Sequence, residues 1–171
     1  MKHTISILVE NHAGVLSRIS GLFSRRGFNI DSLAVGITDD PTISRVTIIV
    51  NGDDYTVEQV EKQLNKLVDV IKLKSFVSDE TISRELMLVK VSSTSQTRGE
   101  IIDIARVMQS KISDITPSSI TIEISDTTDR LEILQELLKP YGILEITRTG
   151  TIALQKGNET IYGKQSSMDI H

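Results

Sequence analysis

Apolar and polar positions repeat in one order along the first half of the chain. Alternating apolar residues predict strands at about 3–9 and 30–37, through Val46–Val50, and from Ile71 onward. Between them, apolar residues at helical spacing predict helices over 14–26 and from Val57 to Leu67. The predicted order is therefore βαββαβ.

The same order returns after a break at Ser78–Thr81. In this second half, Thr97 and Glu100 have the spacing of a capping box at a helix start. Ile143–Leu154 is predicted as the last strand, and the polar residues that follow as a loose tail. The expected division is a first domain at 1–77, a linker at 78–83, a second domain at 84–157 and a polar tail at 158–171.

Two βαββαβ repeats predict an α+β protein with two ferredoxin-like sandwiches in tandem. Each sandwich would place helices on one face of an antiparallel sheet. Such a sheet leaves an edge or a face uncovered, so pairing between chains is a natural remedy. We therefore expect a homodimer.

The connection between the first strand and the first helix is the candidate binding segment. Asn11 is a favoured N-cap residue, and Gly14 then falls at the third helical position, where a capping box would have Glu. This leaves bare amides at the positive end of the helix dipole, which can receive an anion. Phosphate-loop motifs are absent from the sequence, so a small carboxylate is favoured. The pattern also fits a common connection whose glycine merely eases packing.

Composition narrows the classes of function. The 171 residues are 39% hydrophobic and 25% charged, which is typical of a globular protein, and no apolar run has membrane-spanning length. The start of the sequence lacks the pattern of a signal peptide. With no cysteine, disulfides and thiolate metal sites are excluded. The net charge of −4 and the short basic run Arg25-Arg26 argue against nucleic-acid binding. We expect a cytoplasmic protein without a membrane partner.

Candidate catalytic groups do not form a recognisable set. His3, His12 and His171 have no metal-ligand spacing. The pairs Asp39-Asp40 and Asp53-Asp54 fall in turn-like contexts, where Asp is common without chemistry. The sequence therefore predicts a binding module with no catalytic residues and no metal site.

Several segments together carry a recognisable pattern: Glu10–Ile19, Gly21–Leu33, Thr38–Thr47, Arg84–Leu86, Lys111–Asp114, Pro140–Glu145 and Arg148–Gly150. They resemble the regulatory (small) subunit family of acetohydroxyacid synthase, also called acetolactate synthase, and the resemblance covers about residues 2–157. In the first half the resemblance is to the ACT domain of that family. Ala13 departs from the pattern, since many ACT domains have Pro there.

This resemblance implies a function without catalysis in this chain. In the family, the small subunit binds a catalytic large subunit that carries thiamine diphosphate, Mg²⁺ and FAD. That large subunit condenses pyruvate with pyruvate or 2-oxobutyrate. The small subunit raises its activity and confers feedback inhibition by branched-chain amino acids, most often valine. No cofactor is expected in this chain.

The resemblance also implies an effector site between two ACT domains of a dimer. The residues carried over are Asn11, Gly14, Val15 and Leu16 of one chain, facing Asn29 and Ile30 of the other. Amides at Gly14 would bind the carboxylate, the two Asn side chains would bind the polar ends, and the apolar residues would form a wall. Two alternatives stay open at this stage: a free-standing amino-acid sensor that acts through another protein, and an enzyme on a ferredoxin-like scaffold.

Overall fold

The computed structural model describes residues 1–164 and divides the chain into two compact units. One unit contains residues 1–82 and the segment that begins at Thr151, and the other contains 83–150. Each has an antiparallel sheet with helices on one face, so the α+β ferredoxin-like prediction is confirmed. No helix within residues 1–164 is long and apolar enough to cross a membrane.

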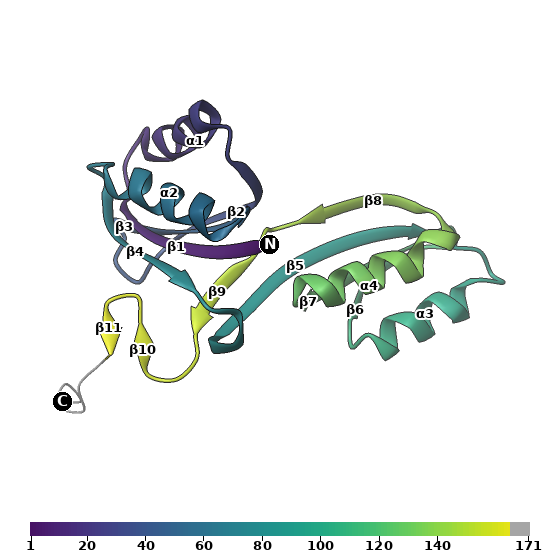
Figure 1. The fold of residues 1–171 in the computed structure, drawn as a ribbon. Helices are drawn as coiled ribbons and strands as arrows, with labels where there is room; N and C mark the ends of the chain where they lie inside the picture. The colour runs from purple at the N-terminus through teal and green to yellow at the C-terminus, as the bar shows by residue number, and fades with distance from the viewer. Residues whose placement is uncertain (165–171) are drawn as a thin grey trace. The chain divides into compact units, whose positions relative to one another are not determined.

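The first unit contains the predicted βαββαβ order (Figure 1). Its four strands pair in the order β2-β3-β1-β4, so β2 and β4 are the edges. The elements are β1 (Lys2–Glu10), α1 (Val15–Arg26), β2 (Asn29–Ile37), β3 (Ile43–Asn51), α2 (Asp54–Asn65) and β4 (Val70–Phe76).

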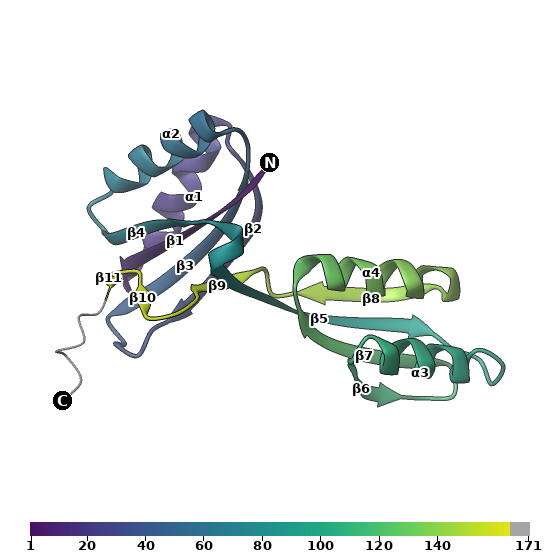
Figure 2. The same ribbon diagram turned by 60° about the horizontal axis from the view of Figure 1, so that its bottom comes forward.

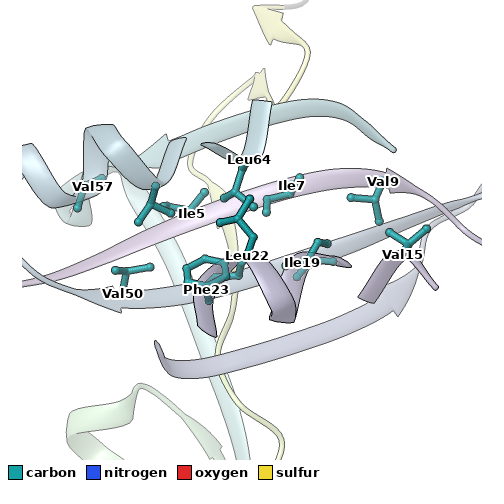
Figure 3. Packing of buried hydrophobic residues seen from close by; sticks show 13 residues of the cluster. Ile5, Ile7, Val9, Val15, Ile19, Leu22, Phe23, Val50, Val57 and Leu64 are labelled. Atoms are coloured by element: carbon teal, nitrogen blue, oxygen red, sulfur yellow. The ribbon is translucent and has the colours of Figure 1, made fainter. Parts of the chain in front are cut away.

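The core of this unit lies between the sheet and its two helices. Alternate residues of β1, Ile5, Ile7 and Val9, are buried in one cluster with residues such as Phe23 of α1 and Leu64 of α2 (Figure 3). Burying an aliphatic or aromatic side chain of this size contributes about 1.5–3 kcal/mol. The alternating apolar residues of the strands and the helically spaced apolar residues of α1 and α2 therefore pack into one core.

The opposite face of this sheet is covered by the C-terminal segment. This segment forms β9 (Ile152–Gln155), β10 (Glu159–Thr160) and β11 (Gly163–Lys164), which lie on the side away from α1 and α2 (Figure 2). Ala153 and Ile161 are buried there. The Thr151 amide donates to Ser32 Oγ at 2.9 Å, and Arg45 Nη2 donates to the Ala153 carbonyl at 3.0 Å.

The structure differs from three sequence expectations in this segment. The single strand expected over 143–154 is broken into β8 (Ile143–Arg148) and β9, with Gly150 at φ 84° between them. The loose tail expected from about 156 is wrong for 159–164, where β10 pairs with β11. The remainder of the expected tail lies outside the described residues. Residues 151–157, which we expected in the second domain, belong to the first unit by their contacts.

The second unit repeats the order with strands arranged β6-β7-β5-β8, while β9 also pairs with β5. Met87, Ile122 and Leu134 belong to its buried core. The expected linker at 78–83 contains a short 3-10 helix at Ser78–Glu80 and the start of β5. The elements are β5 (Thr81–Ser92), α3 (Arg98–Val107), β6 (Lys111–Ile115), β7 (Ser119–Asp126), α4 (Thr128–Leu138), a 3-10 turn (Lys139–Tyr141) and β8.

The capping box predicted at Thr97 and Glu100 is wrong. Thr94 and Thr97 instead exchange bonds, because the Thr97 amide donates to Thr94 Oγ1 and the Thr94 amide donates to Thr97 Oγ1. Glu100 accepts a bond from the Tyr141 hydroxyl at 2.9 Å. The box is therefore shifted back by one turn, with a second threonine in place of Glu.

Candidate functional site

The loop that leaves β1 is bound to the β2–β3 hairpin. The Asn11 amide donates to the Thr42 carbonyl at 2.7 Å, and Asn11 Nδ2 donates to the Pro41 carbonyl at 2.9 Å. The Asn11 side chain is therefore turned to the hairpin and does not cap the helix, which corrects the N-cap prediction. Its Oδ1 atom is left as the acceptor that this side chain can offer to a ligand.

Helix α1 begins later than expected, and Gly14 is its N-cap. Gly14 has φ 88° and ψ −11°, a left-handed conformation that favours glycine, and the first helical bond runs from the Arg18 amide to the Gly14 carbonyl. The helix start has no side-chain cap and no acidic residue in its first turn. The first amides, from Val15 onward, therefore face outward at the positive end of the helix.

A charged cluster lies beside this helix start. Asp69 binds Arg18 Nε at 2.6 Å and His12 Nε2 at 3.0 Å, and His12 Nε2 also lies 3.1 Å from Glu10. The bond from Arg18 holds the pKa of Asp69 below its usual range. The pKa of His12 is raised, first by its ring bond to the Ala13 carbonyl and then by Glu10 and Asp69.

The same cluster has the spacing of metal ligands. One oxygen or nitrogen from each of Glu10, His12 and Asp69 lies within 4.8 Å of the others. Arg18 already holds one carboxylate oxygen of Asp69, so the cluster is explained as an ion-pair network. It fixes the loop between β1 and α1 from the side opposite the hairpin.

A small pocket of about 70 Å³ opens between this loop, α1 and the sheet. It brings together three of the predicted site residues, Asn11, Val15 and Leu16, and adds Val35 of β2, which the sequence analysis did not single out. Val15 is almost fully buried in the core, whereas Leu16 is 44% exposed. Small-molecule sites usually have volumes of about 300–1,000 Å³, so this pocket is far smaller than a complete ligand site.

Of the other three predicted residues, Gly14 is the N-cap of α1 directly before Val15, whereas Asn29 and Ile30 lie elsewhere in the chain. Asn29 and Ile30 begin β2 and pair with Asn51 and Val50, whereas Val35 pairs with Val46 toward the other end of the β2–β3 ladder. A single chain therefore does not bring them to the pocket. The expectation placed them in a second chain, and that arrangement stays a prediction.

The paired carboxylates have structural roles. The Asp40 carboxylate accepts bonds from the amide and hydroxyl of Thr42 in the hairpin, and the Asp53 carboxylate caps α2 by accepting both donors of Thr56. These bonds lower the pKa of each carboxyl group. This agrees with the turn interpretation made from the sequence.

The βαββαβ sheet and the uncapped helix start together define an ACT-type domain followed by a second ferredoxin-like domain. Residues 5–72 match the family profile described as the AHAS small subunit-like ACT domain, and residues 84–157 match the small subunit of acetolactate synthase. The chain belongs to the acetolactate synthase small-subunit family.

Relatives match over nearly their whole length. The chain is 48% identical over 155 residues to the acetolactate synthase small subunit of Mycolicibacterium smegmatis, covering 91% of both chains. It is 46% identical over 159 residues to a probable acetolactate synthase small subunit of Archaeoglobus fulgidus, covering 93% of this chain and 99% of that one. The solved structure of the small subunit from Thermotoga maritima matches with a TM-score of 0.86 and 38% identity, over 92% and 99% of the two chains.

Proposed function

We propose that this chain is a non-catalytic, cytoplasmic regulatory subunit that activates a catalytic acetolactate synthase subunit and makes it sensitive to a branched-chain amino acid. Valine is the first candidate effector. The observation that carries the proposal is the open start of α1 beside a small apolar pocket, in a chain of this family. Catalytic chemistry and its cofactors are assigned to the partner subunit.

The effector's polar groups match what the helix start offers. Its carboxylate would accept bonds from the first amides of α1, and its ammonium group would bind Asn11 Oδ1. Leu16 and Val35 would contact the side chain, because both line the pocket and are partly exposed. An apolar wall of this kind separates valine from leucine or isoleucine by only about 1–3 kcal/mol.

A second chain would complete the site. The pocket is much smaller than a usual small-molecule site, and it reaches the edge strand β2 at Val35. If two β2 strands paired antiparallel around a twofold axis, the beginning of one would lie beside the end of the other. Asn29 and Ile30 of one chain would then approach Val35 of its partner.

The decisive assay measures acetolactate formation by the cognate large subunit with and without this chain. The proposal predicts a higher rate and new inhibition by valine, leucine or isoleucine. Coupling of typical size, about 1–3 kcal/mol, changes the effector response roughly 5- to 150-fold. An unchanged rate with no amino-acid sensitivity would refute the proposal and favour a free-standing sensor.

Substitutions at Leu16 test the position of the carboxylate. Leu16→Glu adds negative charge in the first helical turn, where it favours the helix but repels the effector. Leu16→Gln is the matched neutral control. We expect Leu16→Glu to lose inhibition and keep activation, while Leu16→Gln keeps most of the inhibition. Equal responses from the two variants would remove the effector's carboxylate from this helix start.

A further inference from the structure

A second, larger cavity in the first unit has no role in the proposed function. It has a volume of about 610 Å³ and lies on the sheet face opposite α1 and α2, between the β2–β3 hairpin and the C-terminal segment. Leu8, Ile43 and Ile161 contribute apolar surface, and Arg45 contributes the only cationic group that residues 1–164 place in the lining. This volume is within the range of small-molecule sites, about 300–1,000 Å³.

Arg45 is held at this cavity without a carboxylate partner. Its Nη2 donates to the Ala153 carbonyl at 3.0 Å, and no carboxylate of residues 1–164 lies within ion-pair distance of it. Partial burial lowers the pKa of the guanidinium, although arginine stays charged. A partly desolvated cation with unused donors binds an anion well, and a guanidinium matches a carboxylate in geometry.

The rim of the cavity is apolar and exposed. Ile152 and Tyr162 from the C-terminal segment are 59% and 65% exposed. Exposed apolar side chains that lie together at one opening form a patch of the kind that marks a binding site. A ligand with an apolar body would cover them.

We propose that this cavity is a second ligand site, which binds an amphipathic monocarboxylate with its head group on Arg45 and its apolar body against the rim. Asp39 and Asp40 lie in the same lining and repel any anion, a dianion about twice as strongly as a monoanion. A single negative charge is therefore favoured, held by its contact with Arg45. The site is separate from the helix start, and Val35 is the one residue that lines both.

The test uses the full chain with octanoate as the probe and octanamide as its uncharged match. Isothermal titration calorimetry should show octanoate binding at least roughly tenfold more tightly than octanamide, a difference of about 1.4 kcal/mol. Arg45→Gln should reduce octanoate binding to the octanamide level, because glutamine can still bind the Ala153 carbonyl but carries no charge. Arg106→Gln, at an exposed position in α3, is the control and should change neither affinity.

A second variant keeps the charge of Arg45 and reduces the volume of the cavity. Ala34→Leu would fill part of the cavity from β2, so both probes should bind more weakly while circular dichroism stays unchanged. Valine should not displace octanoate. Displacement by valine, or octanoate binding that survives Arg45→Gln, would overturn the proposal. So would absence of binding together with a weaker dimer in Ile152→Ser, which would assign the patch to a second copy of the chain.

Discussion

Two glycines of α1 should respond to alanine in opposite directions. Gly14 has φ 88°, and a β-carbon there would also lie 3.1 Å from Arg18 Nη1, the mobile end of a flexible side chain. Gly21 lies within the helix, and its added β-carbon would meet only Arg25 Nη1, at 4.0 Å. The cost at Gly14 is therefore backbone strain, while Gly21 is a helix-interior glycine with free space.

The size of each effect follows from these environments. Gly14→Ala should destabilise the first unit by about 1–2 kcal/mol, the cost of a left-handed conformation with a β-carbon. Gly21→Ala should stabilise it by up to about 1 kcal/mol, since alanine is the better helix former. Gly14→Asn is the matched control, and it should lose less than Gly14→Ala because asparagine tolerates this conformation.

Hydrogen exchange followed by mass spectrometry measures this in the intact chain. The slowest amides of β1 report opening of the first unit, and their protection should fall roughly 5- to 30-fold in Gly14→Ala. In Gly21→Ala it should rise. Protection that changes in the same direction in both variants would refute the assignment of Gly14 as a left-handed N-cap.

Three further predictions concern charge and assembly. Because the pKa of His12 is raised, its ion pairs stabilise the fold fully below about pH 6.5 and lose this effect as the pH rises through the raised value. The difference in urea midpoint between the wild type and His12→Gln should therefore shrink as the pH rises. A difference that stays constant with pH would contradict this prediction. Arg148→Met should lower the free energy of unfolding in urea by about 3–5 kcal/mol, because the Glu85 side chain is only 7% exposed and loses two bonds of 3.0 Å. The double variant Arg148→Met with Glu85→Leu should recover most of this loss, because it leaves no buried charge unpaired. If the effector bridges two chains, valine must tighten the dimer in sedimentation experiments, and an identical association constant with and without valine would place the site within one chain.

Local patterns in the sequence were enough to predict most of the fold. Alternation and helical spacing predicted both βαββαβ units. The Asp39-Asp40-Pro41 turn was also correct, since Asp40 closes the hairpin. These features depend on residues within a few positions of one another.

The errors arise where a distant segment competes for a side chain. Asn11 has the local character of an N-cap, but Pro41 and Thr42, about thirty residues away, take both of its donors. Val35 and the Arg18–Asp69 pair were missed for the same reason, because their partners come from other elements. The polar composition after residue 156 predicted a loose tail, although Ile161 in this stretch is buried against the sheet face opposite the helices.

The route of the chain through the first unit has a consequence for how the protein is made. The chain leaves the first unit after residue 82 and returns to it at Thr151. The two crossing points are close together, since the Lys156 amide donates to the Glu80 carbonyl at 2.8 Å. During synthesis, β1–β4 and their helices emerge first, while the segment that covers Leu8 emerges only after the whole second unit. The nascent domain therefore has this sheet face uncovered until the whole second unit has been synthesised, and this is the interval in which a chaperone would bind it.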